Sequence, residues 1–231
     1  MEIKPGDFNR LREVFAGKGV LLSGKLSSAV ERLCFYFAFD ALRNNKKECV
    51  VWVSTDYSYE KAVGMFKEYD IDIRPYLDRF LFVDLITLKS GARAGDSKNV
   101  KYVQDPGNLT ELSLAISEHV DSRKCGLVVI HLLNSMLVYN DLERSMEFIR
   151  ILNARAYDRK FAFLGAFIEG EQDVKAEVSM QIAVDVIAKV SGKDIHIITP
   201  TEVHSFSFEF KKGKLLMTKK QGIFSREEFG L

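Results

Sequence analysis

The chain has 231 residues, of which 47% are hydrophobic and 28% charged, and its formal net charge is +1. This length and hydrophobic content predict one α/β domain over residues 1–231, and the balanced charge excludes a broad basic surface that would attract nucleic acid. Cysteine and glutamine are scarce and charged residues are common, which is typical of heat-adapted proteins.

The three cysteines are Cys34, Cys49 and Cys125, and none belongs to a C-x-x-C pair. Each lies in or beside an apolar segment, so we predict buried thiols in a reducing compartment, with neither a zinc site nor a disulfide framework. We find no signal-peptide pattern and no apolar run of membrane-spanning length. We therefore expect a soluble cytoplasmic protein that makes no contact with a membrane.

Residues 19–43 predict an apolar strand, a tight turn at Gly24 and a long helix that begins near Ser27 or Ser28. This strand–loop–helix order is the plan of a phosphate-binding loop. The helix is apolar nearly all round, so we expect it to be buried on every side, between the sheet and another layer or a partner subunit.

The residue types that such a loop needs are missing. When the pattern G-x-x-x-x-G-K-[ST] is counted from Gly24, Ala29 replaces the second glycine, Val30 the lysine and Glu31 the magnesium-binding hydroxyl. Lys25 occupies the place of a second lysine found in a variant class of phosphate loops, but that class also keeps the first. The predicted vestigial phosphate loop consists of Gly24, Lys25, Ser27, Ser28, Ala29, Val30 and Glu31.

Ser28 and Glu31 have the spacing of a capping box, in which each side chain accepts a hydrogen bond from the other residue's backbone amide. The carboxylate would then supply the anion at the helix N-terminus. A carboxylate about 4 Å from one phosphate charge costs ~1 kcal/mol in water and ~4 kcal/mol at an effective dielectric constant near 20. We therefore expect weak or absent ATP binding.

Three polar residues follow or end predicted buried strands. Asp56 follows the strand at 49–54, Asp84 ends the strand at 80–84, and His131 follows the strand at 126–130. In phosphate-binding ATPases an Asp at the last of these places holds the magnesium water, and a histidine binds magnesium poorly. The trio is our candidate cleft, either a metal or acid–base site or strand-end residues that meet water. We predict no catalytic residue, metal site or cofactor.

The remaining pattern predicts helices at 58–69, 109–123 and 141–159, a buried strand at 161–167, and antiparallel hairpins at about 193–225. Residues 89–108 form a polar stretch with four basic side chains, which is either a solvated loop or a contact for an acidic partner. Five lysines at 211–220 form either a hairpin edge or a contact for phosphate backbones.

The order of these landmarks over residues 17–225 resembles the RecA superfamily, and specifically its KaiC-like archaeal branch. The resemblance rests mainly on residues 21–24, with the sequence LLSG, and 52–56, with the sequence WVSTD. It implies a RecA-like P-loop NTPase fold with a mainly parallel sheet, and an oligomeric habit. It also places Asp56 near the family's catalytic acidic residue and likens residues 183–187 to the family's A-D-G-V-I strand. The replacements at Val30, Glu31 and His131 mean that the family's activity does not carry over.

Three hypotheses follow. The first is a non-catalytic binding or regulatory subunit that acts through homo-oligomer surfaces or a protein or peptide partner. The second is a residual nucleotide or ligand binder, or an enzyme, that uses Lys25, Asp56 and His131 in the old cleft. The third is a nucleic-acid-binding relative of recombinases, which the balanced charge disfavours.

Overall fold

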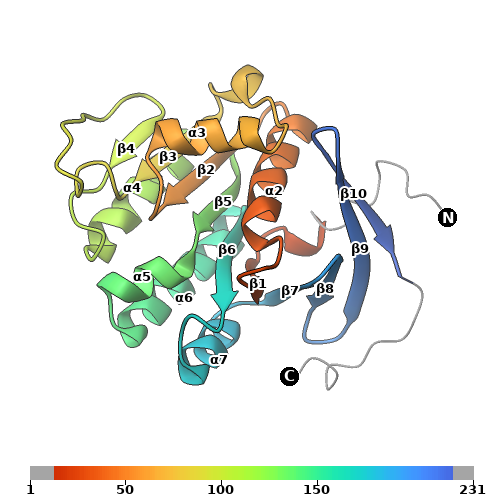
Figure 1. Cartoon of the computed structure of the whole chain (residues 1–231). Helices are drawn as coiled ribbons and strands as arrows, with labels where there is room; N and C mark the ends of the chain where they lie inside the picture. Colours follow the sequence, from red (N-terminus) through yellow and green to blue (C-terminus); the bar gives the residue numbers. More distant parts are fainter. Residues whose placement is uncertain (1–12, 221–231) are drawn as a thin grey trace.

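The computed structural model describes residues 13–220, so the last part of the predicted hairpin region, 221–225, lies outside the described residues. Within this range the strands form one ten-stranded sheet in the order β10-β9-β8-β7-β1-β6-β5-β2-β3-β4 (Figure 1). The strands are β1 (Gly19–Lys25), β2 (Cys49–Ser54), β3 (Phe80–Asp84), β4 (Val100–Tyr102), β5 (Cys125–His131), β6 (Ala162–Glu169), β7 (Val186–Ser191), β8 (Asp194–Ile198), β9 (Val203–Lys211) and β10 (Lys214–Lys219). The run from β7 to β4 is parallel, and β8, β9 and β10 extend it antiparallel.

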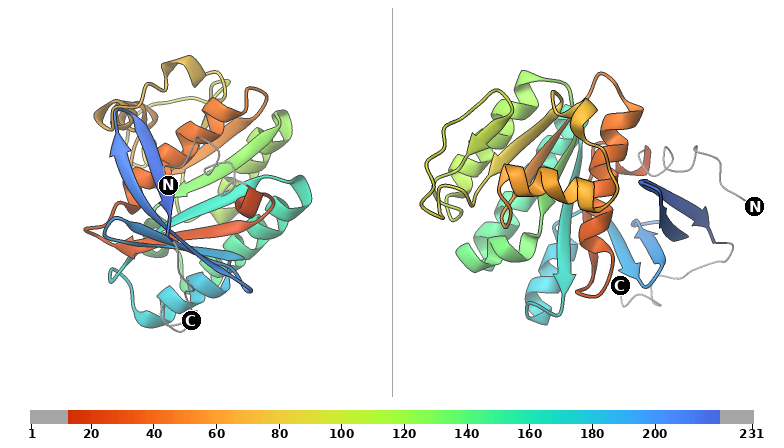
Figure 2. Two further views of the ribbon diagram at one scale, coloured as in Figure 1. Left: turned by 90° about the vertical axis from the view of Figure 1, so that its right-hand side faces the viewer. Right: turned by 45° about the horizontal axis from the view of Figure 1, so that its top comes forward.

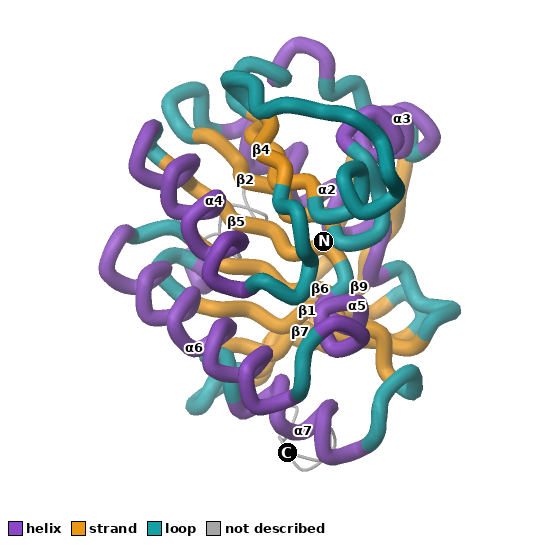
Figure 3. Tube along the Cα trace, turned by 90° about the vertical axis from the view of Figure 1, so that its left-hand side faces the viewer, coloured by secondary structure: helices purple, strands orange, loops and turns teal. Residues whose placement is uncertain are grey.

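The described helices cover both faces of the sheet. They are α2 (Val30–Asn44), α3 (Tyr59–Glu68), α4 (Leu109–Ser122), α5 (Leu133–Tyr139), α6 (Leu142–Arg159) and α7 (Val174–Ile182), with a 3-10 turn at Arg74–Tyr76. One apolar cluster joins α2 and α3 to the sheet, and a second joins α4, α5, α6 and α7 to the opposite face. Figure 3 shows α4 and α6 side by side across that second face.

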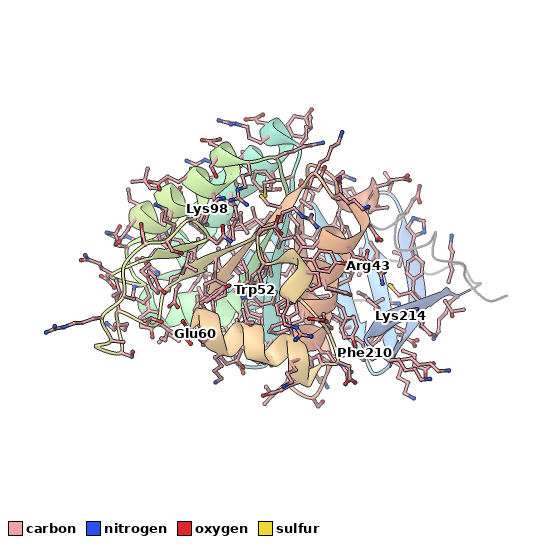
Figure 4. The ribbon with its side chains drawn as sticks, turned by 90° about the horizontal axis from the view of Figure 1, so that it is seen from above. Arg43, Trp52, Glu60, Lys98, Phe210 and Lys214 are labelled. Atoms are coloured by element: carbon pink, nitrogen blue, oxygen red, sulfur yellow. The ribbon has the colours of Figure 1, made fainter. Side chains whose placement is uncertain are left out.

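Helix α2 is buried on nearly every side, as its composition predicts. The sheet covers one side, and β9 and β10 curl around the other, where they lie beside α2 in Figures 1 and 2. The ring of Tyr36 lies 4.8 Å from that of Phe210 on β9, and Figure 4 shows Phe210 next to the helix. The outer layer over α2 is therefore the chain's own antiparallel extension.

Most predicted elements are confirmed, because their periodic patterns are long and clear. The strands at 49–54 and 80–84 have the predicted bounds, and Ser58, Asn108 and Asp141 cap the three predicted helices. Besides the 3-10 turn, a short strand and a short helix were not predicted. Strand β4 lies inside the polar stretch 89–108 and pairs with β3, and α5 follows β5.

Candidate functional site

The carboxyl ends of β2 and β5 and the first turn of α2 bring three polar side chains together. The hydroxyl of Tyr57 donates a hydrogen bond of 2.9 Å to Oε1 of Glu31. The same carboxylate oxygen lies 3.6 Å from Nε2 of His131, at ion-pair distance. Glu31 belongs to α2, Tyr57 follows β2, and His131 ends β5, so the parallel order of the sheet creates the cluster.

The imidazole of His131 is fully buried among aromatic rings. Its centroid lies 5.4 Å from that of Trp52, with the planes 25° apart, 5.7 Å from that of Phe35 and 5.2 Å from that of Tyr57. Neither ring nitrogen has a hydrogen-bond partner among the described residues. Since the aromatic faces offer no strong acceptor, Glu31 is the polar contact of this imidazole.

The contact with His131 lowers the pKa of the Glu31 carboxyl; burial opposes this shift, and the hydrogen bond from Tyr57 adds to it. Burial, followed by the bond to Glu31, raises the pKa of Tyr57. The Nζ atom of Lys61 lies 4.2 Å from the centre of the Tyr57 ring, which brings a further positive charge to the cluster. These shifts keep Glu31 ionised and Tyr57 protonated at neutral pH.

The predicted capping box is wrong. Helix α2 begins at Val30, later than predicted, and its N-cap, Ala29, forms no side-chain cap. The Ser28 hydroxyl is buried without a hydrogen-bond partner among residues 13–220. The physical reason is that Glu31 turns away from the Ser28 amide toward His131 and Tyr57.

The predicted vestigial phosphate loop lies only partly at the molecular surface. Lys25 and Ser27 are exposed, whereas Val30 at the lysine position is fully buried in the core. Gly24 has no room for a side chain, because a Cβ atom there would lie 2.7 Å from the Ser28 hydroxyl oxygen and 2.7 Å from the carbonyl oxygen of Val190. The backbone thus keeps a tight turn, but none of the lysines among residues 13–220 is buried beside it.

A cavity of about 840 Å³ opens beside this loop. Its charged lining residues are Lys25, Glu169 and Glu177. Glu169 accepts a hydrogen bond of 3.1 Å from Ser23, and its Oε1 also lies 3.9 Å from Nζ of Lys189. The lining holds two carboxylates and one lysine, and Lys189 beside Glu169 adds a second positive charge, so the cavity offers no net positive charge to a polyphosphate.

Asp56 and Asp84 are each engaged in a separate local network. Asp56 accepts hydrogen bonds of 2.7 Å from Thr55 and 2.7 Å from Ser135 of α5.

Asp84 is fully buried, and its carboxylate accepts four hydrogen bonds from the adjoining loop and the start of α3. The donors are the amides of Tyr59, Ile86 and Thr87 and the hydroxyl of Thr87. Asp84 and His131 flank Ser54 in neighbouring strands, so strand order brings them to one edge. Their side chains have different partners, and no group of three metal-ligating side chains occurs in the described part of the chain.

Two features of the site could not be read from residue types. Tyr57 directly follows Asp56 in a loop, and its role depends on the position of Glu31. Leu132 has a φ of +61°, a left-handed conformation that is uncommon outside glycine and adjoins His131. Asn134 follows, and its amide forms two hydrogen bonds with the backbone of Ile168, which tie α5 to β6.

Several solved structures have a similar architecture. An uncharacterised protein from Pyrococcus horikoshii in complex with an unknown peptide matches with a TM-score of 0.65 at 16% identity, covering 89% of this chain and 93% of that one. A KaiC-like protein from Pyrococcus horikoshii OT3 matches with a TM-score of 0.61 at 13% identity, covering 88% of this chain and 90% of that one. The chain has a KaiC-like RecA fold.

The flagellar accessory protein FlaH from Methanocaldococcus jannaschii shares the KaiC-like fold, with a TM-score of 0.55 at 12% identity and coverage of 90% of this chain and 91% of FlaH. No protein-family model and no curated protein matches the sequence. No helix among residues 13–220 has the length and apolarity needed to cross a membrane.

Proposed function

We propose that this KaiC-like chain is a binding or regulatory subunit that has lost ATP hydrolysis and acts through a protein or peptide partner. The observation that carries the proposal is the Glu31–His131–Tyr57 cluster. It places an ionised carboxylate in the first turn of α2, where a phosphate-binding loop needs positive charge. The burial of Val30 and the lack of a net positive charge around the neighbouring cavity support the same conclusion.

A second candidate function is residual binding of a small anion. The amides at the start of α2 have no side-chain cap, and the buried Ser28 hydroxyl has no partner among the described residues. Lys25 is exposed at the same loop. Uncapped helix N-termini attract anions, although here the negative charge of Glu31 opposes them.

Thermal unfolding separates these two functions. We expect millimolar Mg-ATP to raise the midpoint temperature by less than about 1 °C. A ligand present at ~100 times its dissociation constant would add ~2.7 kcal/mol, which corresponds to roughly 5–10 °C for a domain of this size. Inorganic phosphate and Mg-ADP are measured in the same way, for comparison with Mg-ATP. A shift above about 5 °C with Mg-ATP, or a magnesium-dependent ATPase rate in the pure protein, would contradict the proposed loss.

An exposed apolar stripe offers a surface for the partner. Val174, Val178 and Ile182 recur every four residues on α7, so they line one side of the helix. Leu26 shares a cavity with Val174 at one end, and Tyr157 shares a cavity of about 420 Å³ with Ile182 at the other. These five side chains, the α7 stripe, expose between 45% and 75% of their surface.

The size of the α7 stripe favours a peptide segment over a second copy of the chain. Its side chains expose on the order of 100 Å² each, whereas a stable dimer buries about 800 Å² per partner. A short apolar peptide needs less area, and the cavities at the two ends can each receive a side chain. Contiguous apolar patches of this kind mark interaction sites. The peptide seen in one structural neighbour is consistent with this choice.

Substitution within the stripe tests the surface. Short random peptides displayed on phage are selected against the wild-type protein, and we expect Val178→Asp to weaken the enriched peptides about tenfold, because burying one valine contributes ~1.5 kcal/mol. Leu216→Asp is the control, since Leu216 is equally exposed on β10. Peptides that bind both variants equally would contradict this surface, and a change of oligomeric state in Val178→Asp alone would indicate a second copy as the occupant.

A further inference from the structure

Two of the three cysteines lie directly opposite each other in the sheet. Cys49 is the first residue of β2 and Cys125 the first residue of β5, and the two are register partners in this parallel pair. Both are buried and belong to the apolar layer beneath α4 and α6. Cys34 belongs to the layer on the other face of the sheet.

An irregularity in the strand pairing produces this juxtaposition. Cys49 is opposite Cys125, but the next residue, Val50, is opposite Leu127, so Gly126 is an extra residue on β5. The amide of Cys49 donates a hydrogen bond of 2.9 Å to the carbonyl oxygen of Lys124, which holds the two strand starts together. Neighbouring strands lie about 4.8 Å apart, within the Cα separations of about 4.4–6.8 Å that disulfides span.

We propose that Cys49 and Cys125 are a modification site that forms a reversible intrachain disulfide by exchange with a small-molecule disulfide such as oxidised glutathione. In the first step the Cys49 thiolate attacks one glutathione sulfur. The glutathione disulfide bond breaks, and one glutathione leaves as a thiolate that takes up the proton released by Cys49. The first step leaves the second glutathione bonded to Cys49 as a mixed disulfide. In the second step Cys125 bonds to the Cys49 sulfur, the mixed disulfide breaks, and the second glutathione leaves with the proton of Cys125. Two protein thiols are oxidised, and one small disulfide is reduced to two thiols.

The groups around the two thiols indicate which cysteine attacks first and which one resolves the mixed disulfide. The neighbouring Cys125 side chain lowers the pKa of the Cys49 thiol; burial and the charge of Glu48 oppose this shift, and the positive charge of Arg123 supports it. The same contact, together with burial, raises the pKa of Cys125. A thiol with a lowered pKa is the better attacking group, so Cys49 reacts first and Cys125 resolves the mixed disulfide.

The disulfide would connect the strands that carry the candidate site. Strand β2 leads to Thr55 and β5 ends at His131, and the Thr55 hydroxyl donates a hydrogen bond of 2.8 Å to the carbonyl oxygen of His131. A covalent link at the starts of both strands would fix their register from the opposite end. This inference is independent of the proposed partner binding.

The test measures the disulfide at equilibrium, so that burial of the thiols does not limit access. The full chain is refolded from urea in glutathione redox buffers, free thiols are alkylated, and the protein is analysed by mass spectrometry. We expect loss of two hydrogens, with Cys49 and Cys125 protected and Cys34 alkylated. The effective concentration of one thiol toward the other should be at least about 30-fold higher in the refolded protein than in urea. A ratio of this size corresponds to the lower end of the stabilisation that a native disulfide typically provides.

Three variants control the assignment. Cys34→Ser should leave the result unchanged. Cys125→Ser should retain a glutathione adduct on Cys49 after oxidation, and Cys49→Ser should lose the intrachain bond; circular dichroism checks that each variant folds. Free thiols at both positions in the refolded wild type, or an effective concentration no higher than in urea, would overturn the inference. A bond that involves Cys34 would also overturn it.

Discussion

Replacing His131 by aspartate is expected to lower the free energy of unfolding by about 3–5 kcal/mol, the range found when a charge is left buried without a partner. The change would place a carboxylate at a fully buried position beside the Glu31 carboxylate, which now lies 3.6 Å from the imidazole. Two carboxylates in this apolar surrounding repel each other and must take up a proton or water. Urea unfolding measures the loss.

A double variant that combines Glu31→Gln with His131→Asp isolates the electrostatic part of the lost stability. Glu31→Gln removes one of the two charges, and in the His131→Asp background it should recover at least ~1 kcal/mol. His131→Asn is the size-matched control, because it leaves a similar space among the rings of Trp52 and Phe35 without adding charge. Equal losses in His131→Asp and His131→Asn would show that packing alone explains the result.

This experiment also bears on the proposed loss of nucleotide chemistry. An aspartate at this position is what the resemblance to phosphate-binding ATPases implies for an active site. If Glu31 makes an aspartate at position 131 unfavourable, then the departures from the phosphate-binding pattern at Glu31 and His131 are energetically coupled. A single reversion at His131 would then not restore magnesium binding.

Asp84→Ala is expected to lower the free energy of unfolding by about 2–4 kcal/mol, since hydrogen bonds to charged groups contribute about 1.5–3 kcal/mol each and losses within one network are not additive. The buried carboxylate accepts from three backbone amides and one hydroxyl, and it fixes the loop after β3 to the start of α3. Urea unfolding again measures the loss.

Two further variants are compared with Asp84→Ala. Asp84→Asn keeps one oxygen acceptor and should lose less stability than Asp84→Ala. The exposed Asp158 should change the stability by less than about 0.5 kcal/mol when replaced by alanine. A loss from Asp84→Ala as small as that of Asp158→Ala would contradict a structural role and return Asp84 to the candidate cleft.

The sequence predicted the main elements of the fold well, because long apolar strands and amphipathic helices carry strong periodic signals. It missed β4 and α5. Strand β4 has three residues inside a polar stretch and depends on pairing with β3, and α5 is a helix of two turns after a left-handed Leu132. Neither signal is long enough to stand out from the surrounding loop.

Residue types alone singled out Glu31 in the predicted loop and His131 in the predicted cleft, but not the contact between them. Val30, Glu31 and His131 are visible as departures from a phosphate-binding pattern in the sequence. The capping box was a local inference, and it failed because a carboxylate chooses among all nearby donors, including a histidine one hundred residues away along the chain. Tyr57 entered the site for the same reason.

The cysteines also separate what the sequence determined from what the tertiary structure decided. The sequence by itself determined that the three thiols would lie in apolar segments, and that a strand, a tight turn and a buried helix would follow one another near the start of the fold. Only the tertiary structure decided that Cys49 and Cys125 face each other, that Glu31 turns toward His131, and that β9 and β10 cover α2. Periodicity is a property of neighbouring residues, whereas these contacts depend on strand order and register, which join segments far apart in the chain.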